Sequence, residues 1–141
     1  MGGVYGVIKI GGVIMKKRLF AGVFVCICIV LAVSLAFAAG LKIIDGKELE
    51  TMMGDGKPIV IVDVREPEEF SAGHIKGAIN IPYDDARPRI FKELSPNDRI
   101  VFVCHGGPMG DELGDLLVKN GYKSVYNLKG GMKKWKGEIV K

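Results

Sequence analysis

Cysteine is scarce in this chain. Two of the three cysteines, Cys26 and Cys28, lie in an apolar N-terminal run, which leaves Cys104 alone in the remainder of the sequence. A lone cysteine cannot form an internal disulfide, so residues 39–141 are not a disulfide-stapled domain. We interpret Cys104 as a reactive thiol, with a buried and inert cysteine at the end of a strand as the alternative.

Acidic residues are absent from the first 38 residues. This segment contains four of the 20 basic residues and none of the 16 acidic ones, so 16 of each sign remain in residues 39–141. The net charge of +4 therefore comes from the N-terminal segment alone. Without an excess of basic charge, residues 39–141 lack the electrostatic footprint of a nucleic-acid-binding domain, and no nucleic-acid partner is predicted.

The N-terminal segment has the pattern of an export signal. The cationic stretch 15–18 precedes a long apolar run, which ends in the small-x-small site Ala36-Phe37-Ala38. This pattern predicts a signal peptide over residues 15–38 and a mature domain over residues 39–141, in the periplasm or another exported location. Residues 1–14 are then an N-terminal extension that arises from a misassigned start codon.

An uncleaved membrane anchor is the alternative for residues 15–38. Their apolar run is just long enough to span a bilayer. The positive flank would stay in the cytoplasm, so an inner-membrane anchor would still leave the domain facing the periplasm. The membrane is a predicted partner only in this case and only through this segment.

Predicted strands and helices alternate along the rest of the chain. Apolar runs predict strands, and capping residues or amphipathic spacing predict the helices between them. We expect strands at residues 41–44, 59–62, 78–81, 100–103 and 123–128, helices at residues 46–53, 66–70, 87–94, 112–120 and 132–136, and a loop at residues 73–77. This alternation favours an α/β fold in which a central parallel sheet of about five strands has helices on both faces.

The residues after the predicted strand 100–103 are the strongest candidate site. Cys104 lies at the carboxyl end of this strand, where parallel α/β sheets bind ligands. A loop rich in glycine and proline follows, and Gly110 and Asp111 are expected to open the next helix. Backbone N–H groups and the helix dipole favour an anion at the sulfur. The predicted anion cradle consists of His105, Gly106, Gly107, Pro108, Met109 and Gly110.

Three segments together resemble the rhodanese family. They are IVDVREPEEFSAGHIKGAINIP (residues 61–82), the Cys104 loop and NGYKSVYNLKGGMKKWKG (residues 120–137), and they follow one another in the family's order. A leader followed by one such domain is similar to the small periplasmic rhodaneses of bacteria. The resemblance implies a rhodanese-like domain that needs no cofactor.

Sulfur transfer is the activity that this resemblance implies. The Cys104 thiolate would attack the outer sulfur of thiosulfate or of a persulfide and carry it as a Cys104 persulfide. Cyanide, a thiol or a cysteine of a partner protein would then remove the terminal sulfur. The domain would thus be an exported thiosulfate or persulfide sulfurtransferase.

The Cys104 loop departs from the family at Met109, because rhodanese loops often end in a basic residue that helps to bind an anionic donor. Gly110 stands where phosphatases of the Cys-x5-Arg type have arginine, which excludes bidentate binding of phosphate. Asp111 and Glu112 beside the loop are expected to disfavour a dianion such as thiosulfate. A persulfide is therefore expected to suit the site better.

Asp63, Arg65 and His74 are the supporting candidates. Asp63 and Arg65 follow a neighbouring strand and are expected to position the loops at that edge, with a substrate contact by Arg65 as the alternative. His74 is expected to form structural hydrogen bonds, and His105 is a candidate for tuning Cys104 or shaping the pocket. The spacing of Cys104, His105 and His74 does not favour a metal site, so no metal is predicted.

A non-enzymatic module is the rival hypothesis. The same fold could dock a partner, or sense sulfane sulfur, through the Cys104 loop without turnover. The missing cation at Met109 favours this rival, whereas the intact Cys104 favours the enzyme. Thiol redox exchange with a partner protein is less favoured, because residues 39–141 contain no second cysteine to resolve a mixed disulfide.

Overall fold

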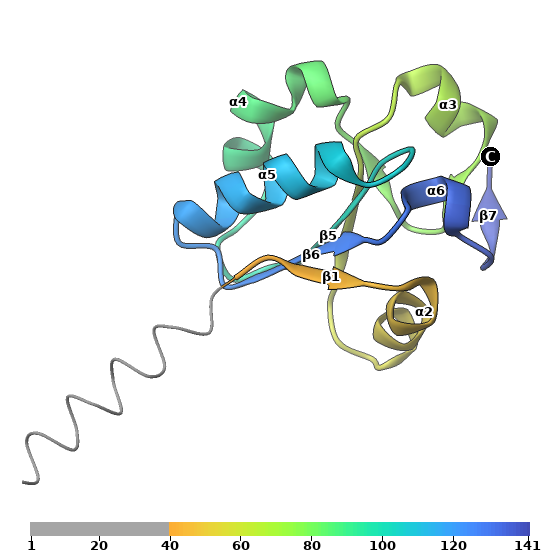
Figure 1. Cartoon of the computed structure of the whole chain (residues 1–141), viewed down its shortest axis with the longest axis horizontal. Helices are drawn as coiled ribbons and strands as arrows, with labels where there is room; N and C mark the ends of the chain where they lie inside the picture. Colours follow the sequence, from red (N-terminus) through yellow and green to blue (C-terminus); the bar gives the residue numbers. More distant parts are fainter. Residues whose placement is uncertain (1–39) are drawn as a thin grey trace, which may run out of the picture. The chain divides into compact units, whose positions relative to one another are not determined.

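A five-stranded parallel sheet with helices on both faces forms the domain in the computed structural model, which describes residues 40–141 (Figure 1). The sheet has the order β1-β6-β5-β2-β4 and consists of β1 (Lys42–Ile44), β2 (Val60–Asp63), β4 (Ile79–Asn80), β5 (Arg99–Val103) and β6 (Ser124–Leu128). The helices are α2 (Gly46–Gly54), α3 (Pro67–Ala72), α4 (Tyr83–Glu93), α5 (Pro108–Lys119) and α6 (Gly131–Lys134). The predicted α/β architecture is confirmed, and the strand before Cys104 is the central one.

Strand β5 separates two apolar clusters, because its side chains alternate between the two faces of the sheet. Ile100, Phe102 and Cys104 belong to the first cluster, whereas Val101 and Val103 belong to the second. Helices α4 and α5 complete the first cluster with Ala86, Ile90, Leu113 and Leu117. Helix α2 and the segment after β6 complete the second cluster with Leu49 and Trp135. The alternation therefore directs Cys104 to the face that α4 and α5 cover.

A small second sheet was not predicted. Strand β3 (His74–Ile75) pairs antiparallel with β7 (Ile139–Val140), so part of the expected loop 73–77 is extended and paired. Two residues are too few to show the alternation that identifies a strand in a sequence. Ile75 is fully buried, and it anchors this pair against the second apolar cluster.

Helices α4 and α5 both begin earlier than predicted. Helix α4 begins at Tyr83 rather than at Arg87, and Pro88 lies inside it. Helix α5 begins at Pro108 rather than at Gly110, and proline is well suited to this first helical position because its missing N–H would have no partner there. Only residues 105–107 therefore separate Cys104 from α5.

The predictions for the N-terminal segment lie outside the described residues. These are the extension 1–14, the signal peptide or anchor 15–38, and the roles of Cys26 and Cys28. Within residues 40–141, no helix is both long and apolar enough to cross a bilayer.

Candidate active site

The Cys104 sulfur accepts a hydrogen bond from the backbone of its own loop. The Gly107 N–H donates to Sγ at 2.7 Å. Gly107 has a φ of +125°, a backbone conformation that glycine adopts readily and other residues rarely do. The Cys104 side chain is 0% exposed, whereas His105 and Gly106 are exposed. The sulfur thus lies at the carboxyl end of β5, below an exposed two-residue stretch of loop.

Fewer backbone N–H groups contribute to the anion cradle than predicted. Of residues 105–110, only Gly107 donates to the sulfur in the structure. Pro108 has no N–H, and the Gly110 N–H donates to the Gly107 carbonyl at 3.0 Å in the first turn of α5. Met109 is half-buried and packs against the apolar cluster that contains Cys104. The early start of α5 accounts for the difference, because it places Pro108, Met109 and Gly110 in the helix.

Helix α6 is fixed against the Cys104 loop (Figure 1). The Met132 N–H donates to the Cys104 carbonyl at 2.8 Å, and the Lys133 N–H donates to the His105 carbonyl at 3.2 Å. A Cβ on Gly131 would lie 2.1 Å from the Cys104 carbonyl oxygen, so a larger residue cannot stand there without displacing the loop. The paired glycines after β6 therefore bring α6 to the site.

Asn127 is a site residue that sequence reasoning missed. Its side chain is almost fully buried, and Nδ2 donates to the Gly107 carbonyl at 2.9 Å and to Asp111 Oδ1 at 2.7 Å. The side-chain Oδ1 is buried without a partner among the described residues, and a Cβ on Gly110 would lie 2.1 Å from it. An amide residue between Tyr126 and Leu128 in a predicted strand was the signal that could have found it, because a buried amide requires partners.

Asp63 and Arg65 form a buried ion pair. Arg65 donates through Nε and Nη2 to both carboxylate oxygens of Asp63 at 2.6–3.1 Å, and through Nη2 to the Gly73 carbonyl at 2.8 Å. Asn80 Nδ2 donates to the carbonyls of Asp63 and Arg65, both at 2.9 Å. Arg65 is thus buried with Nε and Nη2 bonded within the domain, which supports a positioning role for this pair rather than a substrate contact.

The two histidines lie against α3. The His74 ring stacks on Phe70 with 3.7 Å between centroids, and its Nδ1 bonds to the Phe70 carbonyl at 2.9 Å. His105 Nδ1 lies 3.1 Å from Glu69 Oε1. The hydrogen bond to the Cys104 sulfur comes from the Gly107 N–H and not from the His105 ring. Residues 40–141 contain no cluster of side chains suited to a metal.

The acidic residues beside the loop both have partners within the domain. Glu112 accepts hydrogen bonds from the Tyr83 hydroxyl and from the Arg87 guanidinium. The bond to Glu112 raises the pKa of Tyr83 above its usual value. Asp111 accepts from Asn127, as described above. Arg87 offsets the charge of Glu112, whereas Asp111 is bonded to a neutral amide and keeps its charge beside the loop.

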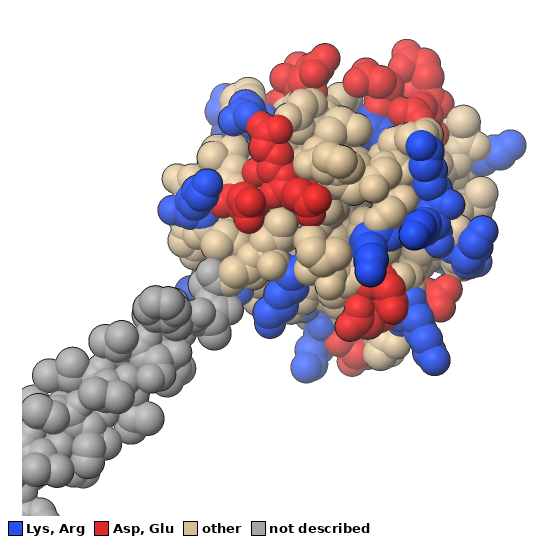
Figure 2. Space-filling view, in the orientation of Figure 1, with Lys and Arg blue, Asp and Glu red and all other residues tan. Residues whose placement is uncertain are grey.

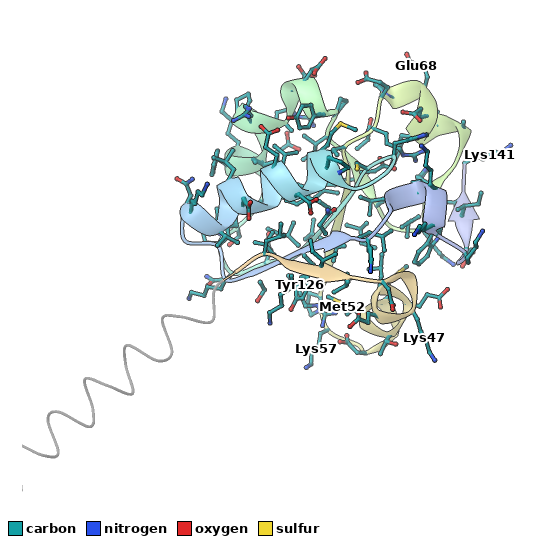
Figure 3. The ribbon with its side chains drawn as sticks, in the orientation of Figure 1. Lys47, Met52, Lys57, Glu68, Tyr126 and Lys141 are labelled. Atoms are coloured by element: carbon teal, nitrogen blue, oxygen red, sulfur yellow. The ribbon has the colours of Figure 1, made fainter. Side chains whose placement is uncertain are left out.

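A hollow of about 630 Å³ lies elsewhere, between β1 and α2. Ile43, Met52 and Tyr126 contribute to its lining, and the last two are labelled beside these elements in Figure 3. No residue of the Cys104 loop lines it. This hollow is therefore separate from the candidate active site.

Comparison with known families decides what this arrangement is. The sequence model of the family "Rhodanese-like domain" matches residues 45–138 of this chain, which include β2, the Cys104 loop and α6. The chain belongs to the rhodanese family. This assignment confirms the resemblance seen in the sequence.

Several known rhodaneses and rhodanese-like proteins are similar to this chain. The thiosulfate sulfurtransferase PspE of Escherichia coli is 36% identical over 73 residues, which cover 51% of this chain and 69% of that protein. An uncharacterized protein of Bacillus subtilis, YqhL, is 42% identical over 79 residues, covering 56% of this chain and 62% of YqhL. The crystal structure of a rhodanese-like domain protein from Staphylococcus aureus superposes with a TM-score of 0.62 at 36% identity, covering 69% of this chain and 93% of that one.

The relatives differ in length. The chain spans 62% of YqhL and 42% of a putative sulfur carrier protein of Bacillus subtilis, YrkF. The shared part is therefore the rhodanese-like domain.

Replacing Gly110 by alanine tests the packing of Asn127 against α5. The added Cβ would clash with Asn127 Oδ1, so we expect the Gly110→Ala variant to lose ~1–3 kcal/mol of unfolding free energy. The matched control is Gly106→Ala in the same loop, where a Cβ meets nothing within 4 Å and φ is not positive. Urea denaturation should show the control unchanged or slightly stabilised. Equal stability of the two variants would contradict the packing described.

Replacing Arg65 by methionine tests the buried ion pair. The change leaves the Asp63 carboxylate buried without its cation, and we expect a loss of ~3–5 kcal/mol in the free energy of unfolding. The control is Arg89→Ala, which breaks an exposed pair with Glu93 and should leave the urea midpoint nearly unchanged. An Arg65→Met variant as stable as this control would show that the pair does not position the loops.

Proposed function

We propose that this domain is a sulfurtransferase of the rhodanese type, in which Cys104 is the nucleophile and the carrier of the transferred sulfur. The observation that supports it most is the Gly107 N–H aimed at the Cys104 sulfur, at the carboxyl end of the central strand. A chain of the rhodanese family that keeps a cysteine in this loop has the group that sulfur transfer requires.

The reaction is a double displacement through a covalent intermediate. The Cys104 thiolate attacks the outer sulfur of the donor, so that a bond from Sγ to this sulfur forms. With thiosulfate, the bond between the two donor sulfurs breaks and sulfite leaves with the electron pair; with a persulfide, the donor thiolate leaves. Cyanide or a thiol then attacks the terminal sulfur of the Cys104 persulfide and restores the thiolate. A cysteine of a partner protein could take the same place as acceptor.

The surroundings of Cys104 suit the nucleophile. The thiolate that attacks the donor, and that is restored after each transfer, carries its negative charge on Sγ, and the Gly107 N–H already points at this atom. Asn127 holds the carbonyl of Gly107, and α6 holds the carbonyls of Cys104 and His105. These contacts fix the loop backbone before any donor arrives.

The burial of Cys104 favours one rival. A sulfur that is 0% exposed can react only when the loop admits the donor, and a module that only docks a partner would not need this access. In that rival hypothesis the fold and the Asn127 contacts still position the Cys104 loop, but no sulfur is transferred. The rival is a binding module whose partner contacts the exposed residues His105 and Gly106.

Mass spectrometry of the intact domain separates the two functions. After exposure to thiosulfate or to a low-molecular-weight persulfide, we expect the domain to gain about 32 Da, one sulfur atom, which a thiol or cyanide then removes. The Cys104→Ser variant should show no gain. A reduced wild-type domain that gains no sulfur from either donor would contradict the enzyme and leave the binding module.

Export is proposed from the sequence of residues 15–38. The cationic stretch, the apolar run and the small-x-small site together support a leader that a signal peptidase removes. The full chain expressed in a bacterial host should then yield a periplasmic form that begins at Ala39, as N-terminal sequencing would show. A chain of full length that sediments with the inner membrane would support the anchor instead.

A further inference from the structure

Strand β1 forms an open edge of the main sheet. Within residues 40–141 its only neighbouring strand is β6, because β1 stands first in the order β1-β6-β5-β2-β4 (Figure 1). The Lys129 N–H donates to the Ile44 carbonyl at 2.8 Å, so the backbone groups of Ile44 point to β6. The preceding residue of an extended strand points the other way, which directs the N–H and C=O of Ile43 to the open edge. An edge of this kind can pair with a further strand.

The side chains beside this edge are apolar and accessible. Ile43 is 51% exposed, and it is one of four exposed large apolar side chains among the described residues. The hollow of about 630 Å³ between β1 and α2 adjoins it, and Met52 and Tyr126 contribute to the lining (Figure 3). Helix α2 therefore leaves space on this face of β1 for the side chains of a neighbouring strand.

The opposite edge of the sheet is less suited to pairing. Strand β4 has only two residues and lies between Gly77, which turns the chain with a φ of +81°, and Pro82, which has no N–H to donate. Strand β1 has three residues and continues into a capped helix. Of the two edges, β1 is therefore the one that can extend the sheet.

Charges of opposite sign flank β1. Lys42 lies at the start of the strand, whereas Asp45 and Glu48 follow its end, and the ion pairs of residues 40–141 include none of these three. Lys42 and Glu48 both line the hollow. Figure 2 shows basic and acidic side chains mixed on the side of the domain where β1 and α2 lie in Figure 1. An antiparallel strand of the same sequence would thus set the basic end of each copy against the acidic end of the other.

We propose that two copies of this chain form a dimer by antiparallel pairing of their β1 strands, which joins two five-stranded sheets into one continuous sheet. A twofold axis at Ile43 would place this residue opposite itself, and each copy would donate the Ile43 N–H to the Ile43 carbonyl of the other. Lys42 of each copy would lie opposite Ile44 of the other, beside the hollow that Glu48 lines. The partner is a second copy because the edge is complementary to itself.

This dimer leaves both Cys104 loops free. Cys104 follows β5, and β6 separates β5 from β1. Because β1 and β5 both run parallel to β6, the antiparallel copy directs its own Cys104 loop to the opposite end of the joint sheet. Sulfur transfer is therefore expected to be independent of the dimer, and the two proposals are tested separately.

Sedimentation equilibrium of the purified protein tests the dimer. We expect the wild type to show twice the mass of one chain. Ile43→Lys should raise the dissociation constant roughly hundredfold, which is tenfold for each copy, since it sets two like charges at the centre of the contact. The matched control is Ile79→Lys, which puts the same charge on β4 at a side chain that is 41% exposed, and it should leave the mass unchanged. Urea denaturation checks that both variants fold.

An exchange of charges tests the antiparallel direction. Lys42→Glu and Glu48→Lys should each weaken the dimer roughly tenfold, because each change brings charges of the same sign together twice. The double variant should return to within roughly threefold of the wild type, since the opposite charges again face each other. A double variant that is as weak as the two single effects combined would overturn this arrangement.

A disulfide detects the same contact in the full chain. In a Cys104→Ser background, Ile43→Cys should yield a covalent dimer under mild oxidation, because opposite residues of such a pair have Cα atoms about 5.5 Å apart. Ile79→Cys in the same background should yield none above the level of Cys104→Ser alone.

Two results would overturn the proposal: a wild type that stays a monomer up to roughly 1 mM, or an Ile43→Lys variant that still dimerises like Ile79→Lys. Persulfide formation reports on the other proposal. Ile43→Lys should gain sulfur like the wild type, and a failure of both to gain sulfur would count against the sulfurtransferase and not against the dimer.

Discussion

The hydrogen bond from the Gly107 N–H to the Cys104 sulfur is the contact around which the site is organised. It requires that only residues 105–107 lie between Cys104 and α5, and it requires a φ of +125° at Gly107. Both conditions bring the loop backbone over the end of the central strand. If either condition failed, the sulfur would still be buried among apolar side chains, but it would have no donor for the charge that sulfur transfer places on it.

Three separate elements hold this loop in place. Strand β6 contributes Asn127, which donates to the Gly107 carbonyl; α6 donates to the carbonyls of Cys104 and His105; and α5 begins at Pro108 directly after the turn. The packing leaves little space, since a Cβ on Gly110 or on Gly131 would meet an oxygen atom at 2.1 Å. The geometry at the sulfur is thus set by the backbone and by glycines rather than by catalytic side chains such as histidine.

Much of this arrangement could be predicted from the sequence because it follows from local patterns. Buried parallel strands are continuous apolar runs, and the run that ends at Val103 placed Cys104 at the correct edge of the sheet. The paired strands β3 and β7 were beyond prediction, because each has two residues and their pairing depends on residues far apart in the chain. The role of Asn127 likewise arises only when β6 lies beside β5, since no local pattern links it to Gly107.

Delivery of sulfur in a single turnover tests the account most directly. The domain would be loaded with thiosulfate, freed of donor by gel filtration, and mixed with cyanide. The account predicts about one thiocyanate per domain, released as the added sulfur disappears from Cys104, because the persulfide is an intermediate and not a side product. A loaded domain that retains its sulfur in the presence of cyanide and of thiols, or that yields no thiocyanate, would contradict the claim that Cys104 carries sulfur for transfer.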